Sequence, residues 1–166
     1  MIKTIIDTWK SVVFNPVKFF DKMPESPWYK FSLVFALTVI YIGLITKYFL
    51  DAIFARALLR YTIGAMILAP IILFIIAAVT HLFVVIFRGR EKFGATFEVL
   101  AYAEAVTIFN FIPGVAIITP IWAMVITFIG IKKIHKLNNI RTIGVLVLPL
   151  LTIILVLFIA LKGVKS

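Results

Sequence analysis

The sequence is dominated by five apolar stretches, each long enough to cross a lipid bilayer. They cover residues 31–50, 61–87, 95–114, 115–131 and 142–161. A helix needs about 20 apolar residues, with a range of about 17–25, to span the hydrocarbon core. Because the bilayer offers no partner to free backbone polar groups, such a stretch folds as a helix. The pattern predicts an all-α integral membrane protein with a five-helix transmembrane bundle.

Composition excludes a soluble protein of this length. Hydrophobic residues make up 63% of the 166 residues, whereas soluble domains average about 45–50%. The formal net charge of +10 is explained by basic residues that flank membrane spans and face anionic headgroups. No soluble segment carries a basic stripe with interleaved aromatics, so we expect no nucleic-acid partner. There is no cysteine, which excludes disulfides and thiolate ligands.

The first 30 residues form a region of their own, and residues 31–166 form the membrane domain. Residues 2–14 place apolar side chains at helical spacing, with lysines and hydroxyl residues opposite, which predicts an amphipathic helix. We weigh two positions for it: in the headgroup plane as an interfacial helix, or packed on the protein's own surface. Trp9 belongs to its apolar face, and Trp28, Tyr29 and Lys30 are typical of interfacial anchors before a first span.

Charge distribution predicts the orientation. With the N-terminus in the cytoplasm, most lysines and arginines fall in the inner segments, namely the first 30 residues, the turn 88–92 and the loop 132–141. Basic residues favour the cytoplasmic side. We therefore expect a multi-pass protein of the cell membrane with a cytoplasmic N-terminus.

The third stretch carries the residues whose placement in a membrane costs the most free energy. It holds Glu98, Glu104 and Asn110, and an ionisable side chain in hydrocarbon costs a few kcal/mol or more unless it has a partner. His81, near the end of the second stretch, lies at a depth between the two acids, so we expect it to pair with one of them. Glu104 is either a proton or cation site or a residue that fixes helix packing, and we favour packing. His135, among lysines in a loop, is expected to be solvated.

Enzymatic motifs are absent from the sequence. It contains no phosphate-binding glycine loop, no HExxH and no GxSxG. We therefore predict no catalytic residue, no cofactor and no metal site.

Several short motifs resemble those of a known family. They are an Asn-Pro-x-x-Phe-Phe element at residues 15–20, an Ala-Tyr-Ala-x-Ala run at 101–105 before Ile112-Pro113, and Gly-Ile-Lys-Lys-x-His at 130–135. In this layout the chain resembles the Yip family of five-span membrane proteins, whose eukaryotic members bind Rab-type GTPases, and it is most similar to short prokaryotic or archaeal members. The resemblance implies the five-span fold and a role in membrane organisation.

We therefore expect a non-enzymatic protein that organises or shapes membrane. Its expected partners are anionic lipid headgroups and a protein, either another chain or a second copy in a homo-oligomer. The alternative is a small transporter or channel that uses Glu104, Glu98 and His81 as an ion or proton site. Ion flux in liposomes separates the two hypotheses.

Overall fold

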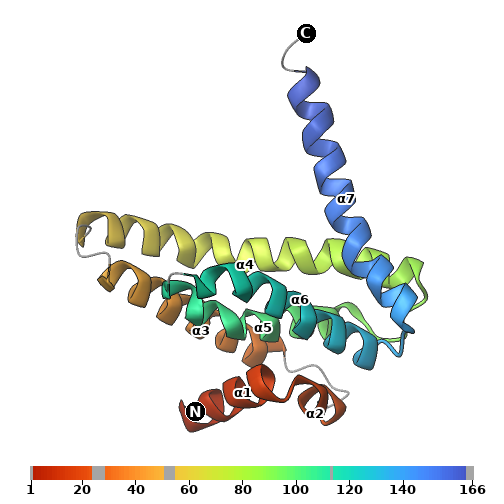
Figure 1. The fold of residues 1–166 in the computed structure, drawn as a ribbon, viewed down its shortest axis with the longest axis horizontal. Helices are drawn as coiled ribbons and strands as arrows, with labels where there is room; N and C mark the ends of the chain where they lie inside the picture. Colours follow the sequence, from red (N-terminus) through yellow and green to blue (C-terminus); the bar gives the residue numbers. More distant parts are fainter. Residues whose placement is uncertain (1, 24–28, 51–54, 113, 164–166) are drawn as a thin grey trace.

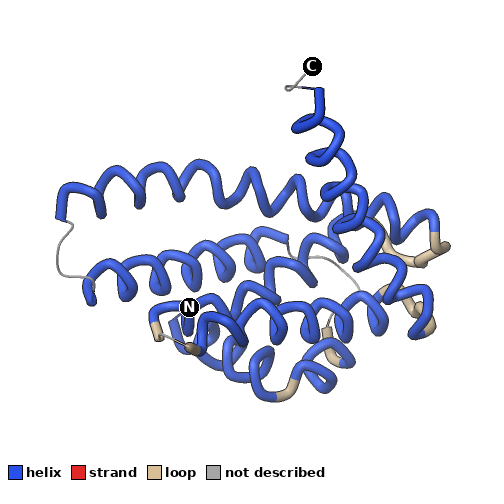
Figure 2. Tube along the Cα trace, turned by 45° about the horizontal axis from the view of Figure 1, so that its top comes forward, coloured by secondary structure: helices blue, strands red, loops and turns tan. Residues whose placement is uncertain are grey.

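The computed structural model describes residues 2–23, 29–50, 55–112 and 114–163, and its regular elements are all helices (Figure 1). A tube view coloured by element type shows helices and loops in these ranges and no strand (Figure 2). In chain order the elements are α1 (Ile2–Phe14), α2 (Pro16–Asp21), α3 (Tyr29–Leu50), α4 (Ala55–Ile86), α5 (Phe93–Ala103), the 3₁₀ helix η1 (Glu104–Phe111), α6 (Val115–Ile134) and α7 (Asn139–Gly163).

The centre of the fold is the α5–η1 segment. It contacts α3, α4, α6 and α1, and most of the side chains of α5 are buried. Small residues allow this position, because Ala101 and Ala105 are fully buried and let neighbouring backbones approach closely. The stretch that carries the membrane acids is therefore the core around which the other helices pack.

This third stretch is not one continuous α-helix, as a single predicted span would be. The α-helix ends at Ala103, and residues 104–111 continue as a 3₁₀ helix. Runs of 3₁₀ helix longer than 3–4 residues are uncommon. The segment ends before Gly114, whose φ of 85° suits glycine and turns the chain into α6.

A close contact of backbones holds η1 in place. A Cβ atom at Gly43 of α3 would lie 2.9 Å from the carbonyl oxygen of Thr107. Only glycine allows this approach, because a methyl group would press on rigid backbone. Gly43 therefore sets the distance between α3 and η1.

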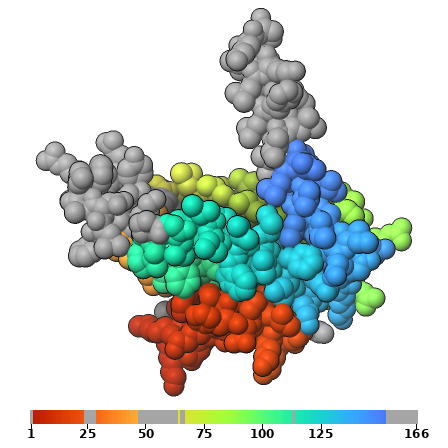
Figure 3. Space-filling view, viewed as in Figure 1, coloured from red at the N-terminus to blue at the C-terminus, as the bar shows by residue number. Residues whose placement is uncertain are grey.

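The two N-terminal helices pack along one flank of the bundle (Figure 3). Val12 and Val13 of α1 are buried in the main core, and Ile5 and Trp9 pack against the same core. The helix lies where the sequence predicts it. Part of its apolar face is covered by the protein and part is exposed, so its position in the headgroup plane stays a prediction.

In the described ranges, three helical segments are long and apolar enough to cross a membrane: Tyr29–Thr46, Ile67–Ile86 and Val115–Ile134. Residues Asn139–Thr152 form a shorter apolar helix, and α7 leaves the bundle at a steep angle to α4 and α6 (Figure 1). The all-helical membrane architecture is therefore confirmed, whereas the count of five spans stays a prediction. The α4 helix also begins at Ala55, so part of the charged connector before the second stretch is an extension of that helix.

Candidate functional site

Three polar side chains from three elements meet at one end of the bundle. The Nδ1 atom of His81, on α4, lies 2.8 Å from the hydroxyl oxygen of Thr96, on α5. The same hydroxyl lies 2.9 Å from Nε2 of His135, the residue that caps α6. Thr96 and His135 are fully buried, and the two imidazole rings are 6.1 Å apart. We call these three residues the His-Thr-His cluster.

The threonine hydroxyl determines which group donates in each hydrogen bond of the His-Thr-His cluster. It donates one proton to one imidazole and accepts an N–H from the other. The Nδ1 atom of His135 is buried without a hydrogen-bond partner. A buried unpaired acceptor is tolerated better than a buried unpaired N–H, so the favoured arrangement has Nε2–H of His135 donating to Thr96 and Thr96 donating to His81. In this arrangement neither imidazole carries a charge.

Burial also keeps His135 neutral. Burial, together with the neighbouring His81, lowers the pKa of His135 from 6.5 to about 4. A charged imidazole here would lose hydration and gain no acid partner. The cluster therefore acts as a neutral hydrogen-bonded clamp between α4, α5 and α6 at neutral pH.

Two tight turns bring His135 into the bundle. The backbone N–H of Arg90, after α4, donates to the carbonyl oxygen of His135 at 3.4 Å, so the turns after α4 and α6 lie together. Lys136 has a φ of 53°, which points its side chain outward while Leu137, next to it, is buried. The loop therefore alternates between the interior and the surface, and the histidine takes an interior position.

A second polar group lies along η1. Residues three apart in a 3₁₀ helix eclipse one another, so Glu104, Thr107 and Asn110 form one polar stripe. All three line a cavity of about 350 Å³ whose other walls are apolar residues of α3 and α4. Thr119 of α6 donates a hydrogen bond to the side-chain oxygen of Asn110. This bond ties the end of η1 to the start of α6.

Glu98 is separate from both groups. It is 3% exposed and lies one turn before Tyr102 on α5. Among the described residues, the one ion pair is between Lys133 and Asp21, at 2.7 Å, and it involves neither membrane acid. The structure therefore buries Glu98 as expected but shows no salt bridge to it.

The expected pairing of His81 with Glu98 or Glu104 is wrong, because His81 bonds to Thr96 instead. The expectation of a solvated His135 is also wrong, since the residue is fully buried. The sequence argument missed Thr96 and Thr107. Depth gave no signal for Thr96, because it stands two residues before Glu98 and is therefore about 3 Å farther from the depth assigned to His81.

The residues expected at the lipid interface do not share one environment in the structure. The indole Nε1 of Trp9 donates to the carbonyl oxygen of Ala105 at 2.7 Å, so Trp9 anchors α1 to η1, and its place at the lipid interface stays a prediction. Tyr29 is 54% exposed and Lys30 is also exposed, and both begin α3. Trp28 lies outside the described residues.

No assembly of three or more His, Cys, Asp or Glu side chains that would hold a metal ion occurs in the described part of the chain. Chemically, the His-Thr-His cluster offers one unpaired acceptor, and the stripe on η1 offers a carboxyl, a hydroxyl and an amide. The Thr96 hydroxyl lies beside two imidazole bases, but Thr96 is fully buried, so the hydroxyl is not open to a substrate.

Comparison with known proteins places the chain in a family. Residues 10–161 match the Yip1 domain. No curated protein and no solved structure matches.

Proposed function

Because the chain belongs to the Yip1 domain family, we propose that it is a non-enzymatic, multi-pass membrane protein that organises or shapes the bilayer by binding lipids and partner proteins. The family match carries the proposal, since it covers most of the chain. Two features of the surface support it, and each suits contact with lipid.

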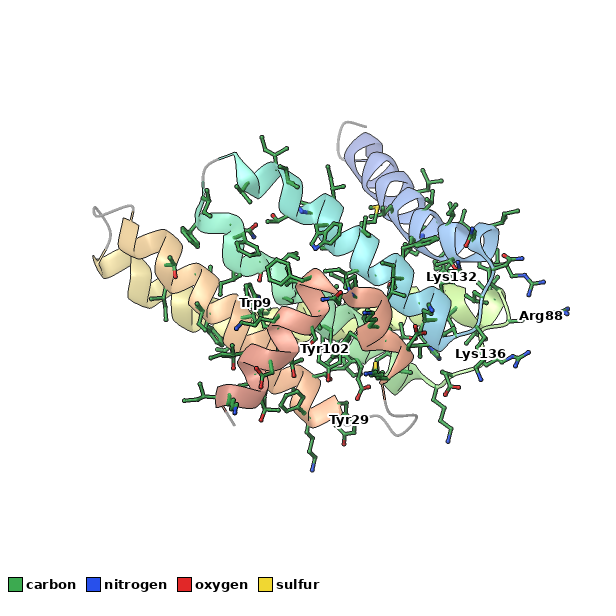
Figure 4. The ribbon with its side chains drawn as sticks, turned by 60° about the horizontal axis from the view of Figure 1, so that its bottom comes forward. Trp9, Tyr29, Arg88, Tyr102, Lys132 and Lys136 are labelled. Atoms are coloured by element: carbon green, nitrogen blue, oxygen red, sulfur yellow. The ribbon has the colours of Figure 1, made fainter. Side chains whose placement is uncertain are left out.

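The first is a basic end of the bundle, made by the turns after α4 and α6. Arg88, Lys132 and Lys136 gather there (Figure 4). The full set at this end is Arg88, Arg90, Lys92, Lys132, Lys133, Lys136 and Arg141. Basic residues next to a span are attracted to an anionic leaflet by about 1 kcal/mol each. We place this end, with the N-terminus, on the cytoplasmic side of the cell membrane.

The second feature is the apolar surface of the long helices. Side chains on α4 and α6 that would be hidden in a soluble protein are exposed: Ile67, Leu68, Ile71, Phe74, Ile75, Ile117, Ile118 and Ile121. A patch of this extent belongs in lipid or against another protein. The outer face of α1 adds Ile2 and Ile6 beside Lys3 and Lys10, so this helix contacts headgroups while it stays on the bundle.

The test uses the full chain reconstituted in vesicles of phosphatidylcholine alone or mixed with phosphatidylglycerol. Cryo-electron microscopy measures vesicle shape and diameter. We expect the protein to change vesicle shape most strongly in the anionic mixture, and high salt to weaken the effect. The double substitution Arg90→Gln/Lys136→Gln should weaken it, whereas the charge-matched Lys3→Gln/Lys10→Gln should have a smaller effect.

Two results would contradict the proposal. One is vesicle shape that does not differ from that of protein-free vesicles. The other is proton or ion flux across these vesicles that Glu104→Gln abolishes, because a transport function would then explain the membrane acids.

A further inference from the structure

A polar groove lies between the N-terminal helices and α5, away from the polar groups described above. Its volume is about 430 Å³. The polar residues that line it are Thr8, Ser11, Asn15, Lys18, Lys22 and Tyr102. Tyr102 comes from the central helix and lies beside α1 and α2 (Figure 4). The groove therefore joins the N-terminal flank to the core of the fold.

The lining of the groove carries positive charge. Lys18 and Lys22 are four residues apart, which places them on one face of α2 and the residue that caps it. The ion pair found among the described residues uses Lys133 and Asp21, so it leaves both groove lysines free. No acidic residue is part of the lining.

The hydroxyl of Tyr102 lies at the floor of the groove and is open to it. The residue as a whole is 8% exposed, but its hydroxyl is not among the buried unpaired atoms, and it makes no hydrogen bond within the described residues. Its ring is held by Phe19, with ring centroids 4.9 Å apart, and by Phe35 at 5.4 Å. The two rings hold the phenol in place, so its hydroxyl is a rigid donor for a ligand in the groove.

Two further groups on the rim are free to bond. The side chain of Asn15 makes no capping hydrogen bond to α2, and the hydroxyl of Thr8 has no partner in the described part of the chain. The hydroxyl of Ser11 already donates to the carbonyl oxygen of Asp7 at 2.8 Å. The groove thus presents two ammonium groups, two hydroxyl donors and an amide, which together suit an anion with several acceptor oxygens.

We propose that this groove binds a phosphate group, presented by an anionic lipid headgroup or by a soluble phosphate compound. Ammonium groups form the strong charge-assisted hydrogen bonds that phosphate oxygens accept. The Tyr102 hydroxyl bonds a further oxygen, and Phe19 and Met23 contact the apolar part of a lipid ligand. This inference rests on the proposed function and deepens it, because it names the chemical class that the N-terminal flank recognises.

The experiment measures binding to the full chain in nonionic detergent micelles by isothermal titration calorimetry. The probes are dihexanoyl phosphatidic acid, dihexanoyl phosphatidylcholine and inorganic phosphate. We expect phosphatidic acid to bind about tenfold more tightly than phosphatidylcholine. Lys18→Gln/Lys22→Gln should weaken phosphatidic acid about tenfold or more, and Tyr102→Phe about threefold to tenfold. Lys3→Gln/Lys10→Gln, which removes the same charge from α1, should change the affinity less than about twofold.

The outcomes separate the two sources and the two proposals. Phosphatidic acid binding well above inorganic phosphate identifies a headgroup, and equal binding identifies a soluble phosphate. No binding of either probe, or binding that the groove variants leave unchanged, overturns the proposal. Equal losses in the groove and control variants overturn it as well. Thermal unfolding confirms that Tyr102→Phe is folded. Because the vesicle experiment reads shape and this one reads phosphate affinity, either proposal can fail while the other stands.

Discussion

The indole of Trp9 donates a hydrogen bond to the carbonyl oxygen of Ala105 across 96 residues of sequence, at 2.7 Å. This bond joins the first helix to the 3₁₀ segment at the centre of the fold. The acceptor is in the stretch where the α-helical hydrogen-bonding pattern has just ended. A second indole bond, from Trp122 to the carbonyl oxygen of Val13 at 3.2 Å, holds the other end of α1.

Replacing Trp9 with phenylalanine should loosen α1. The change leaves the Ala105 carbonyl without its partner, and we expect a loss of about 1–3 kcal/mol of stability. Hydrogen–deuterium exchange should show faster exchange at residues 2–14. Tyr29→Phe, at an exposed aromatic residue, is the control and should leave exchange unchanged. Equal protection of α1 in Trp9→Phe and the parent protein would show that the bond does not hold the helix.

Replacing Thr96 with valine should destabilise the clamp between α4, α5 and α6. Valine keeps the shape but removes the hydroxyl that joins His81 and His135, so buried imidazole nitrogens lose their partners. We expect a loss of about 2–4 kcal/mol in thermal unfolding in micelles. Thr96→Ser should retain most of the stability. The matched control is Thr127→Val, because the buried Thr127 hydroxyl donates only within its own helix, to the Ala123 carbonyl oxygen at 2.8 Å. A similar loss in both valine variants would argue against a special role for the cluster.

Acid should weaken the same clamp. The unfolded chain protonates His135 near its ordinary pKa of 6.5, whereas burial and the neighbouring His81 lower the pKa in the folded protein to about 4. Between these values the unfolded state binds more protons, so this stability is complete above pH 6.5 and is lost as the pH falls toward 4. Melting temperatures between pH 7.5 and 4.5 should decline less steeply in His135→Gln than in the parent protein. Parallel declines would assign the acid sensitivity to other groups.

Two glycines in long helices should respond in opposite ways to alanine. At Gly43 a methyl group would lie 2.9 Å from the backbone oxygen of Thr107, so Gly43→Ala should cost about 1–3 kcal/mol by forcing α3 away from η1. At Gly64 a methyl group would meet no described atom within 4 Å. Gly64→Ala should be neutral or raise stability by up to about 1 kcal/mol through helix propensity. Thermal unfolding of the two variants measures the difference, and equal effects would mean that the contact between α3 and η1 is loose.

Much of the architecture could be predicted because a bilayer restricts a long apolar stretch to a helix. Hydropathy and short motifs predicted the helical N-terminal segment, the importance of residues 95–114 and the family resemblance. The Yip1 domain match confirms the family. The winding of residues 104–111 was not predicted, because the hydrophobic pattern of an apolar segment does not separate α from 3₁₀ hydrogen bonding.

The polar contacts were harder to predict for a physical reason. His135 is surrounded by lysines in the sequence, which indicates a solvated loop, yet Lys136 turns outward at a positive φ and the histidine is buried. Depth along a helix predicted which groups share a level with His81, but the direction of a side chain around the helix decides its partner. Thr96 and Glu98 are close in depth, and the threonine is the one that faces His81.

The polar stripe on η1 depends on how the backbone is wound. Eight residues rise about 16 Å as a 3₁₀ helix and about 12 Å as an α-helix. Rewinding Glu104–Phe111 as an α-helix would rotate Asn110 about 120° away from Glu104 and draw the start of α6 inward by about 4 Å. The alignment of the three polar groups and the length of this segment therefore change together. The contacts of Trp9 and Gly43 hold the segment in its longer, 3₁₀ form.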